Sequence, residues 1–161
     1  MSELLVDNTA TFSPCRRYRY TLWRRWDDGP YAMFVGLNPS TADETTDDPT
    51  IRRCIRFARD WGYSALCMTN LFALRATDPK AMLADPEPIG AENDDRLFQA
   101  SREAGIIVAA WGAHGSHRRR DRDVLRMLRH VHHLGLTKSG QPRHPLYLRA
   151  DSTPARLTPD A

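Results

Sequence analysis

The chain has 161 residues, of which 41% are hydrophobic and 27% charged, with a formal net charge of +3 and a pI near 9.0. These values are ordinary for one soluble globular domain with a real core. No run approaches the roughly 18 apolar residues of a membrane span, and three scattered cysteines without a CxxC pair argue against a disulfide framework or a zinc knuckle.

The N-terminal region predicts an arm followed by a strand. The first ten residues, MSELLVDNTA, have neither a basic region nor the apolar core of a signal peptide, so we expect a cytoplasmic protein. Residues 1–14 are mixed and polar, which favours a loosely held arm. Alternating polar and apolar residues over 18–23, followed by the turn signal at 27–30, predict a strand or hairpin.

The segment YAMFVGLNPS at 31–40 is central to the prediction. Its apolar run stops at Gly36, and Asn38-Pro39-Ser40 follow at once, which predicts a buried strand opening into a polar turn. In open α/β sheets, ligands lie beyond the carboxyl ends of the strands. Gly36 would let a ligand approach the backbone, and Pro39 would help to hold the Asn38 amide in one orientation. The alternative is that this motif only caps a turn.

The rest of the chain alternates between helical and strand patterns. Asp48-Pro49 predicts a helix start and Gly62 its end; the arginines of this helix lie off its apolar stripe, either as a solvated face or as phosphate contacts. Apolar runs at 64–71 and 105–111 predict two further buried strands. Helices are expected within 91–104 and 116–133, and a short strand at 133–136. The pattern predicts one domain over 1–149, with a parallel sheet covered on both faces, and a disordered tail over 150–161.

Four loops are expected at one edge of this sheet. They are the segments 36–40, 69–70, 111–114 and 143–147, which bring amides, a histidine and arginines together. The sequence has no GxSxG, GxxxxGK[ST] or HExxH motif, and the spacing of its histidines fits no well-defined metal site, so we expect neither a metal nor a cofactor. His144, in a polar loop before a proline, is a candidate hydrogen-bonding catalyst, although a plain loop histidine is an equal alternative.

Short motifs in the expected loops, taken in order, resemble the uracil-DNA glycosylase superfamily. They are GLNPS at 36–40, TNLFALR at 69–75, WGAHG at 111–115 and RHPLY at 143–147. The longer segments GLNPSTADETTDDPTIRRC, TNLFALRATDP and GQPRHPLYL are similar to a bacterial and phage family named domain of unknown function 1643. This chain departs from the strongest uracil glycosylases in having Asn38 in place of aspartate, no serine after His144-Pro145, and no Cys₄ set for an iron–sulfur cluster.

The resemblance implies a three-layer α/β/α fold around a mostly parallel four-stranded sheet, with an additional N-terminal strand or hairpin. It implies an N-glycosidase that removes a deaminated or modified base, turned out of the DNA stack into a pocket. Asn38 and His144 would be catalytic. Base-binding residues would be Asn70, Gly36, Leu37, Phe72 and Trp111. Phosphate or DNA contacts would come from Ser40, Thr41, Arg52, Arg118, Arg119 and Arg143.

Three alternatives stay open from the sequence. The protein could be a non-catalytic reader of modified bases, a hydrolase of free nucleosides or nucleotides, or a structural protein whose arginine faces bind other proteins. For the preferred hypothesis we expect a monomer whose partner is nucleic acid, DNA in preference to RNA, or a nucleotide. We expect no association with a membrane.

Overall fold

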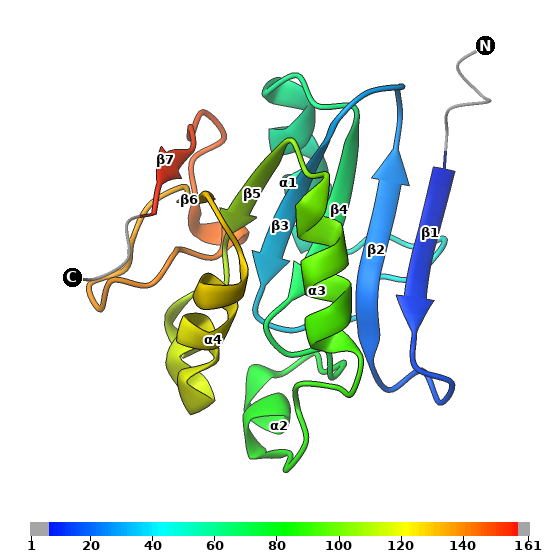
Figure 1. Ribbon diagram of the computed structural model, residues 1–161, viewed down its shortest axis with the longest axis vertical. Helices are drawn as coiled ribbons and strands as arrows, with labels where there is room; N and C mark the ends of the chain where they lie inside the picture. Colours follow the sequence, from blue (N-terminus) through cyan, green and yellow to red (C-terminus); the bar gives the residue numbers. More distant parts are fainter. Residues whose placement is uncertain (1–6, 158–161) are drawn as a thin grey trace.

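The structure is a computed structural model that describes residues 7–157. It contains one seven-stranded sheet with helices on both faces (Figure 1). In chain order the elements are β1 (Asp7–Phe12), β2 (Arg19–Arg25), β3 (Tyr31–Gly36), α1 (Pro49–Asp60), β4 (Ala65–Asn70), α2 (Pro79–Ala84), α3 (Asn93–Arg102), β5 (Ile106–Ala109), the 3₁₀ segment η2 (Ala113–Arg119), α4 (Arg120–Met127), β6 (Val131–His133), the 3₁₀ turn η3 (Pro145–Tyr147) and β7 (Ala155–Arg156).

The sheet is mixed, with the order β1-β2-β4-β3-β5-β6-β7. The pairings of β3 with β4, β3 with β5, and β5 with β6 are parallel, whereas those of β1 with β2, β2 with β4, and β6 with β7 are antiparallel. The predicted α/β class is therefore confirmed. The sheet has seven strands, of which the four central ones, β4, β3, β5 and β6, are parallel to one another, and half of its six pairings are antiparallel. Parallel pairs arise where a helix crosses between the strands; the ends of the chain return without such a crossover and add antiparallel strands.

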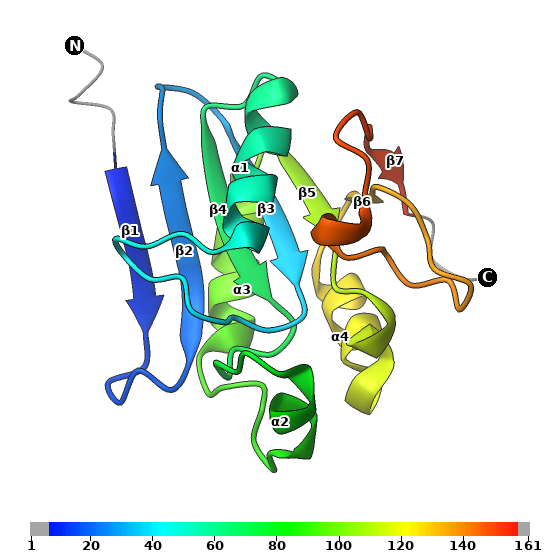
Figure 2. The same ribbon diagram turned by 180° about the vertical axis from the view of Figure 1, so that it is seen from behind.

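Strand β3 lies at the centre of the core, and all six of its residues are buried. Met33 and Val35 belong to the apolar cluster under α3 and α4, whereas Ala32 and Phe34 belong to the cluster under α1. Figure 2 shows α1 on the face opposite to α3. A continuous apolar run, rather than an alternating one, is what a strand covered on both faces requires.

Helix α1 begins as the sequence predicts. The Asp48 side chain accepts a hydrogen bond from the Ile51 N–H at 2.9 Å, and Pro49 occupies the first turn. This cap satisfies one of the free N–H groups of the helix end. On the buried face, the rings of Phe57 and Trp61 stack with Phe34 of β3, with centroid distances of 6.5 and 5.8 Å.

The structure differs from the prediction between residues 116 and 133. Instead of one helix, η2 is followed by α4, which ends at Met127, and β6 begins at Val131. Arg118 and Arg119 have φ angles of 55° and 56°. Two consecutive residues in the left-handed region cannot continue a right-handed helix. Apolar periodicity alone did not reveal this break.

The two ends of the chain also differ from the prediction. Residues 7–12 of the expected arm form β1, and Ala155–Arg156 in the expected disordered tail form β7 against β6. Residues 1–6 of the arm and 158–161 of the tail lie outside the described residues. Among the helices of the described part, none is long and apolar enough to cross a membrane.

Candidate functional site at the carboxyl edge of the sheet

The order of the central strands defines where a ligand would bind. The chain leaves β3 toward α1 on one face and leaves β5 toward α4 on the other, although β3 and β5 are neighbours. In α/β sheets, the usual ligand position is beyond the carboxyl ends of two neighbouring strands that diverge in this way. The loops after β3, β4, β5 and β6 all contribute to this edge.

The Asn38 side chain is held by the backbone of the loop after β4. Its amide nitrogen donates to the carbonyl oxygens of Pro39, Leu74 and Ala76 at 3.1, 3.4 and 2.9 Å. Because three carbonyl oxygens surround one end of the Asn38 amide, the atom at that end is the nitrogen, which can donate to them. Asn38 therefore clamps two loops together, and its Oδ1 makes no hydrogen bond within residues 7–157.

Asn70 is the most unusual polar group at this edge. It ends β4 and is only 2% exposed, yet its Nδ2 has no hydrogen-bond partner among the described residues. Its Oδ1 lies beside Gly36, where a Cβ would come within 2.8 Å of it, so glycine leaves the space that Asn70 occupies. A buried amide donor without a protein partner is rare, and this donor is available to an acceptor from outside the chain.

Three of the predicted base-binding residues are parts of the core. Leu37, Phe72 and Trp111 are buried in the cluster between the sheet and α3 and α4. The Trp111 Nε1–H donates to Gln141 Oε1 at 2.8 Å. A flipped base could stack on Phe72 or Trp111 only if the core rearranged. Packing with distant helices, which local sequence does not show, decides this burial.

His144 lies beside the loop after β5, with its Cβ 3.7 Å from the position of a Cβ on Gly112. Its Nδ1 accepts the N–H of Leu146 at 3.2 Å. The neutral ring therefore carries its proton on Nε2, which bonds to no other described residue. Burial lowers the pKa of His144, and the nearby Asp48 carboxylate acts more weakly in the opposite direction. At neutral pH the imidazole is an uncharged donor.

We predict that His144 titrates below its ordinary pKa of 6.5 in the folded protein. Because the unfolded chain then binds the proton more tightly, the contribution of His144 to stability is complete above pH 6.5 and decreases as the pH falls toward the folded pKa. NMR titration of the ring, with His144→Gln to assign the signal, measures this. A folded pKa at or above 6.5 would contradict the prediction.

The predicted phosphate contacts are divided between separate places. Ser40 and Thr41 line a groove of about 560 Å³ together with Arg16, Arg17 and Arg75. Arg52 lines another depression, of about 360 Å³, on α1. The side chains of three further arginines are exposed. Arg118 donates to the carbonyl of Asp85, a residue that also lines the Ser40 groove, and Arg119 follows Arg118 in the chain. Arg143 donates to the Tyr147 carbonyl.

Sequence reasoning missed the arginines of the Ser40 groove. Arg16 and Arg17 precede β2, and Arg75 ends the segment TNLFALR. The groove forms where the turn between β1 and β2 meets the loops after β3 and β4. The cluster of arginines before β2 was a signal in the sequence, but only the sheet order brings it next to Ser40.

The architecture and this edge define a mixed α/β protein with a polar, arginine-rich candidate ligand site. The chain belongs to the family described as "Protein of unknown function (DUF1643)", whose model matches residues 19–146. The predicted membership in that family is confirmed. No curated protein and no solved structure matches the chain, so the resemblance to the uracil-DNA glycosylase superfamily stays a prediction.

Proposed function

We propose that this protein recognises a nucleobase at the carboxyl edge of its sheet and is an N-glycosidase acting on a deaminated or modified base in DNA. One observation carries the proposal: the buried Asn70 Nδ2 has no partner among the described residues. An amide at that place can donate to a carbonyl oxygen of a base that has left the stack. The resemblance of four loop motifs to the uracil-DNA glycosylase superfamily supports the same substrate class.

The proposed reaction uses three side chains. A water oxygen bonds to the C1′ carbon of the sugar, the N-glycosidic bond breaks, and the bond electrons leave with the base. The water loses one proton to the solvent, and the departing base anion takes up a proton from the solvent. His144 donates its Nε2 proton in a hydrogen bond to a base oxygen as negative charge grows there. The Asn38 Oδ1 orients the water, and Asn70 holds the base. Ser40 and Thr41 contact phosphate. An amide accepts a proton poorly, so we expect a slow reaction.

A non-catalytic reader of modified bases is the second candidate. The specific observation in its favour is at Asn38, whose amide nitrogen is occupied by three backbone carbonyls and which supplies no carboxylate. A reader needs the hydrogen bonds of Asn70, but it needs no group that activates water.

The two candidates are separated by oligonucleotides that contain uracil, hypoxanthine, xanthine or hydroxymethyluracil, as single and double strands. Alkali-labile sites report base removal, and fluorescence anisotropy reports binding. Asn70→Ala and His144→Ala should each reduce the rate of base removal by about 100-fold, the usual cost of one transition-state donor. Asn8→Ala is a matched control, because Asn8 is an exposed amide on the edge strand β1.

The result for the intact protein decides between the two. Base-dependent binding that Asn70→Ala abolishes, without any base removal, would establish the reader. If the protein neither removes a base nor prefers any modified base, both candidates fail.

A further inference from the structure

Two arginines meet on one aromatic ring beside Ser40. The guanidinium carbon of Arg16 lies 3.8 Å from the centroid of the Phe12 ring, and that of Arg75 lies 5.0 Å from the same centroid. Arg16 also has a φ of 61°, an uncommon conformation for a residue other than glycine. Contact with the ring offsets part of the repulsion between the two cations. The turn between β1 and β2 thus holds two like charges together at the groove.

Arg75 is the arginine of this groove that has no carboxylate partner among the described residues. Arg75 donates to the backbone carbonyls of Ser40 and Arg16, and to no carboxylate within the described part of the chain. Arg17 reaches Asp85 at 3.2 Å in an exposed pair. Two hydroxyls, those of Ser40 and Thr77, lie 3.5 Å apart at the same groove. Guanidinium groups and hydroxyls together are the groups that proteins use for phosphate.

A further arginine adds positive charge behind the groove. Arg19 is 2% exposed; its guanidinium donates to the Ala42 carbonyl at 3.1 Å, and its Nε has no partner among residues 7–157. Burial lowers the pKa of Arg19 to about 10; the Asp48 carboxylate acts more weakly in the opposite direction, and the charge of Arg75 acts in the same direction as burial. Arg19 therefore remains protonated at neutral pH. Arg19 thus adds a buried positive charge near Arg75, and it forms no hydrogen bond to a carboxylate among the described residues.

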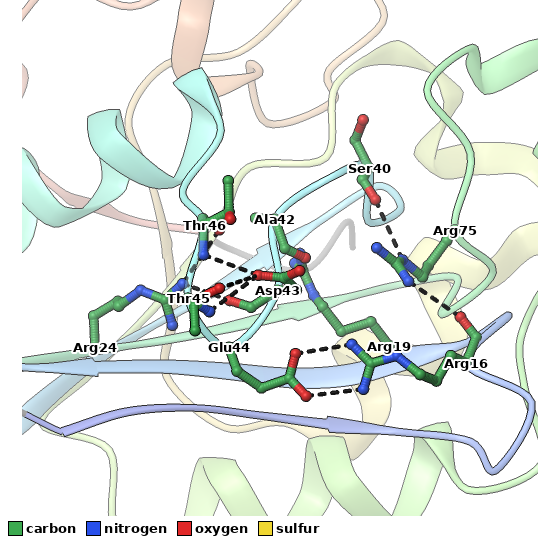
Figure 3. Close-up of polar contacts among 10 residues, drawn as sticks. All are labelled: Arg16, Arg19, Arg24, Ser40, Ala42, Asp43, Glu44, Thr45, Thr46 and Arg75. Atoms are coloured by element: carbon green, nitrogen blue, oxygen red, sulfur yellow. Dashed lines mark hydrogen bonds and ion pairs between the residues drawn. The ribbon is translucent and has the colours of Figure 1, made fainter.

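Glu44 occupies Arg16 in the way a phosphate would. Its two carboxylate oxygens accept from the two terminal nitrogens of Arg16, both at 2.8 Å (Figure 3). The side chains are 47% and 41% exposed, and an exposed pair of this kind contributes little to stability. Arg16 lowers the pKa of the Glu44 carboxyl to about 2, so the carboxylate is ionised at neutral pH.

The backbone conformation of the loop that carries Glu44 is held by hydrogen bonds other than those between Glu44 and Arg16. Asp43 Oδ1 accepts the N–H groups of Thr45 and Thr46 at 3.0 and 2.9 Å, and the buried Arg24 donates to the Asp43 carbonyl. Glu44 can therefore leave Arg16 by a change of side-chain rotamer, while the backbone of the loop stays in place.

We propose that the groove lined by Arg16, Arg17, Ser40, Arg75 and Thr77 binds a phosphate group, and that Glu44 is a built-in competitor for Arg16. The inference deepens the proposed function, because it adds a phosphate anchor on the same β3 loop as Asn38. The phosphate belongs either to a nucleic acid strand or to a free phosphate compound, and both sources share this chemistry.

The test is a pair of substitutions with opposite effects. The probes are a fluorescein-labelled oligonucleotide of normal bases with a 5′-phosphate, the same strand with a 5′-hydroxyl, and inorganic phosphate as a competitor. Arg16→Ala should weaken binding about tenfold, the effect of losing a charge-assisted hydrogen-bonding group. Glu44→Gln should tighten binding about two- to fivefold, the range set by an exposed ion pair.

Arg149 and Asp151 supply matched controls, because they form another exposed pair of an arginine and a carboxylate, near residue 150. Arg149→Ala and Asp151→Asn change net charge by the same amounts, so they measure the effect of net charge alone. The proposal is overturned if Glu44→Gln tightens binding no more than Asp151→Asn, or if Arg16→Ala weakens it no more than Arg149→Ala.

The probes also distinguish the source of the phosphate. Competition by inorganic phosphate indicates a free phosphate compound, preference for the 5′-phosphorylated strand indicates a strand end, and equal binding of both strands indicates internal phosphodiesters. Each of these results supports the proposed site if Arg16→Ala weakens the binding of that probe and Glu44→Gln tightens it. All probe strands lack modified bases, so failure of base recognition leaves this result unaffected.

Discussion

Trp111→Ala should lower the free energy of unfolding by about 3–5 kcal/mol, the usual cost of truncating a buried tryptophan. The Trp111 ring is 1% exposed, and Gly115 lies so close that a Cβ there would come within 2.0 Å of the ring. Truncation leaves a cavity under α4 and removes the donor to Gln141. Urea unfolding followed by circular dichroism measures the change.

Trp111→Phe is the control for this prediction. It keeps an aromatic ring in the core but removes the indole N–H. The free energy of unfolding should therefore fall by less, about 1–3 kcal/mol, because the ring is smaller and the Gln141 oxygen loses its donor. If Trp111→Ala unfolds like the native protein but binds oligonucleotides more weakly, the ring stacks on a base and the core assignment is wrong.

Asn38→Asp should destabilise the protein by about 2–4 kcal/mol, because it places a charged acceptor against three carbonyl oxygens. The amide nitrogen that donates to Pro39, Leu74 and Ala76 would be replaced by oxygen. The substitution would introduce the carboxylate that the strongest uracil glycosylases are expected to carry here, and the structure indicates that this loop arrangement does not accept it. Thermal and urea unfolding measure the loss.

Asn38→Ala and a pH series provide the controls. Alanine removes the donor without adding a charge, so Asn38→Ala should be more stable than Asn38→Asp at pH 7. The neighbouring carbonyls and partial burial should raise the folded-state pKa of the new carboxyl above about 3.9. The loss of unfolding free energy in Asn38→Asp is then present at neutral pH, and it becomes smaller as acid protonates the new carboxylate. If the Asn38→Asp variant is as stable as the native protein, the amide nitrogen of Asn38 does not hold the loops after β3 and β4 together as described.

The β3 loop connects the two proposed parts of the site. Asn38 joins this loop to the loop after β4, and Ser40, two residues later, lines the arginine groove. A nucleotide unit could thus place its base near Asn70 and its phosphate near Arg16. Variants of Asn70 and Arg16 should therefore separate base preference from overall affinity.

Local sequence determined the elements whose stability depends on neighbours along the chain. The apolar run ending at Gly36 predicted β3, and Asp48-Pro49 predicted the start of α1, because burial on both faces and capping impose local residue choices. The family segments, GLNPS among them, were also recognisable from residue order alone.

Tertiary structure decided the features that depend on residues far apart in the chain. The edge strands β1 and β7 exist because neighbouring strands offer them hydrogen bonds, and no local pattern reveals that partner. Likewise, Trp111 became a core residue through packing with distant segments, and Arg16 met Glu44 because the β3 loop crosses toward β1. Residue type specifies what a side chain can bond or bury, whereas the course of the backbone selects the partner.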